Sequence, residues 1–108
     1  MVAHGLDLSR IAAPMVNQSD LPFRTLVRHY NASLVYTQML LPERLLNDQD
    51  YLEFHLRGLH EEYDRPVVVQ LCGNDPDVVV RAARTVVDRA DAIGASSFGE
   101  TRNCVRAS

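Results

Sequence analysis

The sequence has no tryptophan, only two cysteines, and no hydrophobic run close to the roughly 20 residues that a membrane-spanning helix needs. The cysteines, Cys72 and Cys104, lack the paired spacing of a zinc site or a disulfide scaffold, so we expect two free thiols. Positive charge is also scarce, because 11 arginines and no lysine stand against 14 acidic residues. A segment of this charge is not expected to bind nucleic acid by itself.

The N-terminus has no basic stretch followed by an apolar one, so we predict no signal peptide. The sequence therefore predicts a cytoplasmic protein, with the nucleus as an alternative location, and neither a membrane nor a metal among its partners. A hydrophobic fraction of 46% and a charged fraction of 23% are ordinary for a globular domain.

The clearest element pair is a strand followed by a helix in the second half of the chain. Residues 67–71 are apolar except for one glutamine, a pattern that is typical of a parallel strand buried on both faces. Asp75 is then expected to cap a helix whose first residue is Pro76. One side of this helix carries apolar residues at helical spacing. They are Val79, Ala82, Ala83, Val86 and Val87.

The first half repeats this alternation. Residues 10–13 are predicted to form a strand that Pro14 ends, and Ser19 is predicted to cap the helix that follows. That helix is expected to bury one stripe, formed by Phe23, Leu26, Val27 and Tyr30, and to end at Asn31 in a left-handed conformation. Residues 33–37 are then predicted to be a second strand, and Pro42 to open a second helix through residue 46.

This alternation favours an α/β fold, although the pattern alone leaves an open doubly wound sheet as an alternative. Residues 47–65 give no clean boundary. Their acidic cluster, Glu61, Glu62 and Asp64, is expected to be a solvated face. The histidines have no partner at metal or nucleophile spacing and are expected at the surface. They are His4, His29, His55 and His60.

Two features could bind a ligand. Pro14, Met15 and Val16 lie where the first strand meets its loop, although proline and methionine could simply end the strand and fill a gap. Gln70 lies inside a run of buried valines, where its amide needs a hydrogen-bond partner. That partner could be a ligand or the backbone of a neighbouring loop.

Three segments together carry a family resemblance: residues 12–24, residues 34–39 (Leu-Val-Tyr-Thr-Gln-Met) and residues 67–76 (Val-Val-Val-Gln-Leu-Cys-Gly-Asn-Asp-Pro). In order and wording they resemble the start of the tRNA-dihydrouridine synthases, flavoenzymes built on a (β/α)8 barrel. The eukaryotic enzymes that act on uridines 16 and 17 are the most similar. A complete barrel needs roughly 250 residues. The resemblance therefore implies a partial TIM barrel, with three βα units and the start of strand four.

The resemblance also implies a chemistry. Pro14, Met15 and Val16 would lie against the flavin ring of FMN, and Gln70 would bind FMN through its amide. Tyr36, Thr37 and Met39 would line the pocket below the flavin and the substrate base. The complete enzymes use NADPH to reduce FMN, transfer hydride to C6 of a tRNA uridine, and protonate C5 with a cysteine.

The resemblance stops within strand four. The family motif there is Asp-x-Ile-Asp-x-Asn-x-Gly-Cys-Pro, whereas Asp91, Ala92 and Ile93 begin it and Gly94 departs from it. Residues 94–99 have turn composition, so no strand is expected to continue, and the proton-donor role is not transferred to Cys104. We expect a loose leader over residues 1–9, an FMN-barrel segment over residues 10–93, and an unrelated tail over residues 94–108.

These departures suggest a truncated, frameshifted or alternatively spliced synthase that is inactive by itself and does not bind tRNA alone. Two other interpretations remain open at this point. The chain could be a small α/β binding or interaction module in which Met15 and Gln70 are structural. It could also derive from a different flavin barrel, such as a relative of dihydroorotate dehydrogenase.

Overall fold

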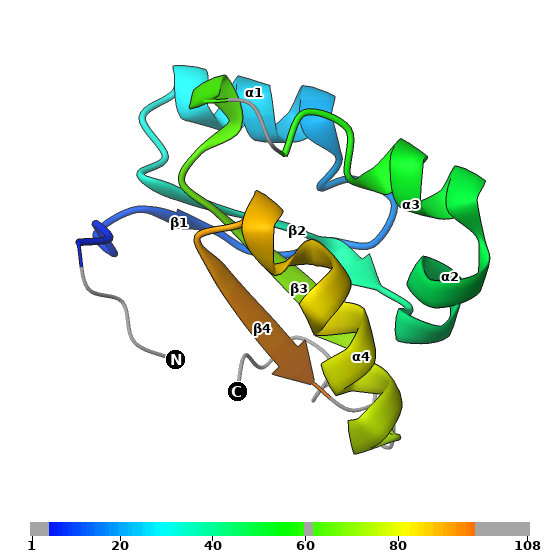
Figure 1. The fold of residues 1–108 in the computed structure, drawn as a ribbon. Helices are drawn as coiled ribbons and strands as arrows, with labels where there is room; N and C mark the ends of the chain where they lie inside the picture. Colours follow the sequence, from blue (N-terminus) through cyan, green and yellow to red (C-terminus); the bar gives the residue numbers. More distant parts are fainter. Residues whose placement is uncertain (1–4, 60–61, 97–108) are drawn as a thin grey trace.

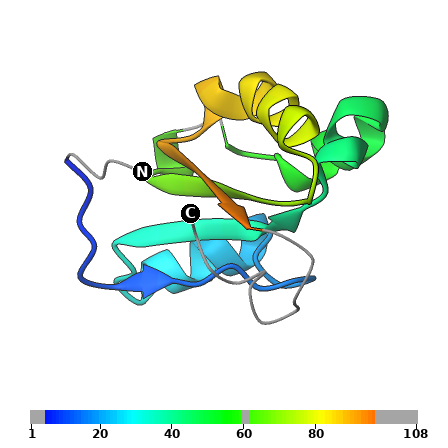
Figure 2. The ribbon, with the colours of Figure 1, turned by 90° about the horizontal axis from the view of Figure 1, so that it is seen from below.

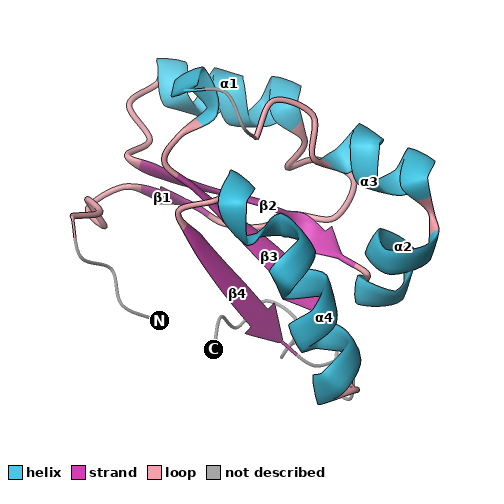
Figure 3. Ribbon diagram, in the orientation of Figure 1, coloured by secondary structure: helices cyan, strands magenta, loops and turns pink. Residues whose placement is uncertain are grey.

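The computed structural model describes residues 5–59 and 62–96, in which four parallel strands form one sheet in the order β1-β2-β3-β4 (Figure 1). The strands are β1 Ile11–Ala12, β2 Leu34–Leu40, β3 Val67–Cys72 and β4 Ala92–Ser96. The helices are α1 Leu21–His29, α2 Pro42–Asn47, α3 Gln49–His55 and α4 Pro76–Val86, with 3-10 turns η1 Glu62–Asp64 and η2 Val87–Arg89 (Figure 3).

The strands follow one another in chain order, with a helical connection after each of the first three. A doubly wound sheet would instead reverse its strand order at a switch point. The protein therefore has the α/β architecture of a partial (β/α)8 barrel, as predicted, and the doubly wound alternative is wrong. Figure 2 shows the sheet from below, with α4 over β3 and β4.

The two faces of β3 are buried by different partners. Val67, Val69 and Leu71 face α2 and α4, where they pack with Leu45, Ala82, Val86 and other residues of the main core. Val68 faces the opposite way, toward the inside of the curved sheet, and packs with Leu34 and Tyr36 of β2. The predicted strand buried on both faces is confirmed, because all six residues of β3 are buried.

Several local predictions are confirmed. Asp75 caps α4 by accepting a hydrogen bond from the Asp77 N–H, and Pro76 is the first helical residue. Pro42 opens α2 in the same way. Asn31 follows α1 with φ 74°, in the left-handed region. At the start of α4 and α2 a side chain or a proline ring satisfies, or removes, a backbone group that the helix end leaves without an internal partner, whereas at Asn31 the left-handed backbone ends α1.

The predictions for α1 are wrong in two respects. Ser19 does not cap the helix; Asp20 holds the N-cap position and makes no side-chain cap hydrogen bond. The predicted buried stripe is also incorrect, because Leu26 is 53% exposed and Tyr30 is 74% exposed. The one residue of α1 that is fully buried is Arg24.

Arg24 is buried because it pairs with Asp64, which is also fully buried. The Arg24 Nη2 atom lies 2.8 Å from Asp64 Oδ2, and Arg24 Nε donates to both carboxylate oxygens at 3.2 Å. Arg28 binds the same carboxylate and also donates to the Pro66 carbonyl oxygen at 2.9 Å. The prediction of a solvated acidic face is therefore wrong at Asp64, which joins α1 to the segment before β3.

Both ends of the described region depart from expectation. Residues 5–9 were expected to be loose, but Leu6 packs against the inner cluster of Leu34, Tyr36 and Val68. The fourth strand does not stop at residue 93, because β4 continues through Ser96 in parallel register with β3. Backbone pairing with β3 overrides the turn composition of this stretch. The predicted tail beyond it, including Cys104, lies outside the described residues.

We expect Asp64→Asn to destabilise the folded chain by about 3–5 kcal/mol, because it leaves two guanidinium groups without their buried counter-charge. Urea unfolding followed by circular dichroism measures this free energy. The control is Asp48→Asn, which breaks the exposed ion pair of Asp48 with Arg44 and keeps a residue suited to the N-cap of α3. Equal unfolding midpoints for the two variants would contradict the role assigned to Asp64.

Candidate functional site

The carboxyl edge of the sheet carries a row of side chains directed to its inner face. In the parallel register Met39 pairs with Gln70 and Gln70 pairs with Gly94. Residues that pair directly across parallel strands point to the same side of the sheet. Two residues earlier on β3 and β4, Val68 pairs with Ala92 and also with Tyr36 of β2, so these three residues form a second row. The predicted residues Tyr36, Met39 and Gln70 are thus on one face.

Gln70 is fully buried in the middle of this edge. Its side-chain Nε2 donates to Ser96 Oγ at 3.0 Å, whereas Oε1 accepts no hydrogen bond from the described residues. A serine hydroxyl can donate or accept, so either orientation of the amide leaves one of its two polar atoms unpaired. A buried amide atom without a partner is costly, and a ligand that supplies one removes that cost.

Gly94 leaves the space that the Gln70 amide occupies. A Cβ atom at position 94 would approach Gln70 Oε1 to within 3.0 Å and would lie 3.3 Å from its Cδ. The same Cβ would be 3.7 Å from Cε2 of Tyr36. The glycine therefore lets Gln70 lie across β4 beside the ring of Tyr36, and this position sets the direction of the amide.

Strand β2 contains one extra residue next to this row. Tyr36 and Met39 pair with Val68 and Gln70, so three steps on β2 oppose two steps on β3. One extra residue on one strand of a pair is the feature that defines a β-bulge. The Thr37 hydroxyl accepts the Gln70 backbone N–H at 3.0 Å and donates to the Gln38 carbonyl oxygen at 2.9 Å. The buried Thr37 side chain thus takes the place of a ladder hydrogen bond.

The predicted corner at the end of β1 is closed by Ser19. The Met15 backbone N–H donates to Ser19 Oγ at 2.8 Å, and the Met15 carbonyl oxygen accepts from the backbone N–H groups of Gln18 and Ser19. Pro14 and Met15 are partly buried, and Val16 is 52% exposed. Ser19 is fully buried because its hydroxyl folds this loop instead of capping the helix.

The two parts of the predicted site lie at the same edge of the sheet, with β2 between them. Residues 14–16 follow the end of β1, whereas Gln70 is near the end of β3. Two strand spacings amount to about 10 Å. A ligand that contacts both parts must therefore be extended, as a multi-ring aromatic system is.

A polar cluster that we did not predict lies behind the same loop. Asp20 Oδ1 is 3.0 Å from Gln38 Nε2 and 3.0 Å from His55 Nδ1, and these two nitrogens are 3.1 Å apart. Gln38 Oε1 accepts the Asn17 backbone N–H at 3.0 Å. A neutral His55 would carry its proton on Nδ1, because the neighbouring carboxylate can only accept. The expectation of a surface histidine is wrong at His55, which is partly buried.

No sequence signal pointed to this cluster, since Asp20, Gln38 and His55 come from three separate elements. Tyr51 borders it, with its ring centroid 4.4 Å from that of His55. The Tyr51 hydroxyl accepts the Leu41 backbone N–H at 3.0 Å, and burial raises the pKa of this phenol. Tyr51 therefore stays protonated at neutral pH and helps to support the cluster.

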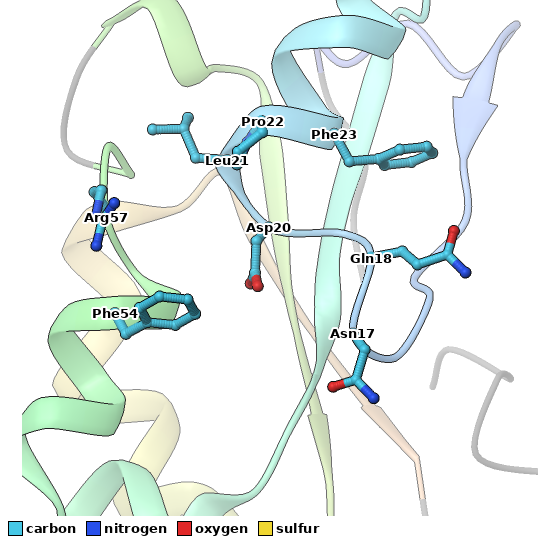
Figure 4. Close-up of a pocket in the computed structure, with 8 residues that line it drawn as sticks. All are labelled: Asn17, Gln18, Asp20, Leu21, Pro22, Phe23, Phe54 and Arg57. Carbon is cyan, nitrogen blue, oxygen red and sulfur yellow. The ribbon is translucent and has the colours of Figure 1, made fainter.

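Beside the cluster is a hollow of 430 Å³ between the start of α1 and the end of α3. Figure 4 shows Asp20 and Phe54 on opposite sides of this hollow, with Arg57 beyond the end of α3. The remaining residues that line it come from the loop before α1 and its first turn. They are Asn17, Gln18, Leu21, Pro22 and Phe23.

Within residues 5–59 and 62–96, no group of three or more histidine, cysteine, aspartate or glutamate side chains is arranged to hold a metal ion. No helix in the described part of the chain is long and apolar enough to cross a membrane. Cys72 is buried at the end of β3.

Parallel strands in chain order, with a helical connection after each of the first three, define the class of the βα barrels, whose ligands bind at the carboxyl edge of the strands. A family model described as Dihydrouridine synthase (Dus) matches residues 10–95. The chain belongs to the dihydrouridine synthase family. The resemblance inferred from the three segments is thereby confirmed.

Individual relatives agree with the family model. The tRNA-dihydrouridine(16/17) synthase (NAD(P)(+)) of Saccharomyces cerevisiae is 44% identical over 86 residues, which cover 79% of this chain and 20% of that protein. A similarly named protein of Rattus norvegicus is 43% identical, covering 77% of this chain and 19% of its own. For tRNA-dihydrouridine synthase B of Pseudomonas aeruginosa the identity is 37%, and the coverage is 72% and 23%. The chain spans about a fifth of the length of these relatives.

We expect Gly94→Ala to cost about 1–3 kcal/mol of folding free energy, because the new methyl group overlaps the Gln70 amide. Thermal or urea unfolding of the single variants and of the double variant Gly94→Ala with Gln70→Ala gives the coupling between the two positions. The substitution at position 94 should cost less when the amide is absent. The same cost in both backgrounds would show that Gln70 does not occupy this space.

Proposed function

We propose that the protein to which this chain belongs reduces uridine to dihydrouridine in tRNA, with FMN as cofactor and NADPH as reductant. A tRNA substrate is compatible with a cytoplasmic or a nuclear location. One observation from this chain carries the proposal, namely the buried Gln70 amide with an unpaired polar atom at the carboxyl edge of a βα-barrel sheet. Family membership and the names of the relatives support the reaction.

The residues present fit a flavin. The edge of the flavin ring alternates N–H donors with carbonyl acceptors, and an amide can meet either kind of group. Gln70 already uses one amide atom on Ser96, so it has one hydrogen bond to offer the cofactor. The strand spacing between Gln70 and residues 14–16 suits a flat ligand of several rings.

Each side chain of the proposed pocket then has a specific role. Gln70 would bind the polar edge of the flavin and fix its rotation in the plane. Pro14, Met15 and Val16 would contact the ring and exclude water from it. Tyr36 and Met39, which share the inner face with Gln70, would form the wall below the flavin and the substrate base. Thr37 would hold the backbone of Gln70 in place.

When bound, reduced FMN supplies the hydride that is added to C6 of the uracil ring. The residues of this chain would bind and orient the cofactor and would keep the site dry, because Gln70, Tyr36 and Thr37 are all buried. No described residue is assigned the proton transfer to C5. That role would need a proton donor from outside residues 5–59 and 62–96.

A titration of FMN tests the proposal through the fluorescence of the flavin. We expect saturable quenching with the wild-type chain and at least about tenfold weaker binding with Gln70→Ala, since a hydrogen bond to a buried group is lost. The matched control is Gln49→Ala, which removes an exposed amide that is bonded to Glu53 on α3. That variant should bind FMN as the wild type does.

A folded wild-type chain that gives no saturable quenching would contradict the proposal and would favour the small binding module considered above. Circular dichroism on the same samples establishes that each variant is folded. Equal FMN affinities of the wild type and Gln70→Ala would contradict the role of Gln70 while leaving flavin binding itself in place.

A further inference from the structure

The hollow beside α3 has an aromatic wall and a polar wall, and neither serves the flavin pocket. The Phe54 ring is 54% exposed, and the Arg57 guanidinium carbon lies 5.3 Å from its centroid. Across the hollow, Asn17 and Gln18 carry exposed side-chain amides that make no hydrogen bond within the described residues. An aromatic ring and a guanidinium group offer stacking surfaces, and amides can donate and accept at the edge of a planar ligand.

Both walls are held in place by buried interactions. The Arg57 carbonyl oxygen accepts from Arg24 Nη2 at 3.2 Å, so the aromatic wall is tied to the buried ion pair. The Asn17 backbone N–H is bound by Gln38, whose amide also donates to Asp20. The hollow is therefore formed before a ligand arrives, and binding would not require these backbones to be ordered first.

The charge of the hollow restricts the ligand class. The Asp20 side chain is 24% exposed and lines the hollow, where its negative charge would repel a phosphate group. Arg57 alone does not form the cationic cluster that a nucleic-acid backbone requires. A planar, uncharged ring with donors and acceptors on its edge is not repelled by Asp20 and needs no cationic cluster. Unpaired RNA bases are recognised in this manner, by stacking on aromatic or arginine side chains with hydrogen bonds to their edges.

We propose that the Phe54–Arg57 hollow binds an unpaired base of the tRNA other than the uridine that is reduced. This inference rests on the proposed function, since that function supplies the RNA. The volume of 430 Å³ is within the range of small-ligand sites and leaves room for one base. The position also fits, because Asn17 is two residues from Met15 and their Cα atoms are within about 7 Å.

The polar cluster beside the hollow and the proposed flavin pocket receive different side chains from β2. Met39 shares the inner face with Gln70, whereas Gln38 turns toward Asp20 and His55 behind the loop. A base held at the hollow would thus lie outside the barrel, next to the loop that carries Pro14 and Met15. It would position the RNA relative to the site without taking part in the reaction.

The absence of tryptophan from the sequence gives a direct test. Phe54→Trp introduces a single indole into the proposed stacking surface of the full chain. We expect a single-stranded RNA octamer of mixed sequence to quench its emission in a saturable manner, and the same octamer annealed to its complement to quench much less. Adding Arg57→Gln should raise the half-quenching concentration about fivefold, because a cation–π partner and a stacking plane are lost.

The matched control is Tyr30→Trp, which places an indole at a more exposed position, directly after α1 and outside the hollow. The proposal is overturned if both variants respond equally, or if duplex and single strand quench Phe54→Trp alike. It is also overturned if the emission is already blue-shifted and insensitive to RNA, since a protein segment would then cover the ring.

A second measurement does not depend on the introduced indole. Anisotropy of a fluorescein-labelled octamer should show about tenfold weaker binding to Phe54→Ala and unchanged binding to Tyr30→Ala. FMN titration separates this result from the proposed function. Phe54→Ala should bind FMN normally, whereas RNA quenching in a chain that binds no FMN would support the hollow and contradict the flavin enzyme.

Discussion

The buried ion pair between Arg24 and Asp64 is the interaction on which the arrangement of this chain depends. It joins residues 40 positions apart, and both side chains are fully removed from solvent. Such a pair is costly to desolvate and is tolerated only when further hydrogen bonds complete it. Here the carbonyl oxygens of Ser19 and Arg57 also accept from Arg24. One guanidinium group therefore orders the start of α1, the end of α3 and the approach to β3, which together surround the candidate sites.

The site follows from how parallel strands meet at their carboxyl ends. Regular pairing brings Met39, Gln70 and Gly94 into one row, and the missing side chain at Gly94 admits the Gln70 amide. Ser96 satisfies only half of that amide. Because a buried polar atom without a partner is unfavourable in the folded chain, this arrangement is stable at a cost that a ligand can remove. Binding of such a ligand would therefore be coupled to folding at Gln70.

The elements with simple periodicity could be predicted from the sequence, and those governed by long-range pairing could not. The all-buried strand β3 and the capped start of α4 depend on neighbouring residues, and both are confirmed. The burial of α1 was wrong because an arginine becomes a core residue only when Asp64 is present, and nothing local reveals that pairing. β4 was predicted too short because its register with β3 outweighs its composition. Likewise, Gln70 was recognised by its polarity in an apolar run, whereas the Asp20, Gln38 and His55 cluster combines residues from three elements.

The extra residue in β2 has a consequence for how this protein can vary. Regular alternation would place Tyr36 and Met39 on opposite faces, yet their pairing with Val68 and Gln70 puts both inside and turns Gln38 outward. Loss of one residue between Tyr36 and Met39 would remove the bulge and leave a regular ladder in which both side chains still face inward, because the extra residue is what breaks the alternation. A single-codon deletion there would instead remove particular contacts: without Thr37 the Gln70 backbone N–H loses its hydroxyl acceptor, and without Gln38 the outer cluster loses its amide. The extra residue is therefore kept by the hydrogen bonds made in this stretch and not by the direction of the side chains at the strand end.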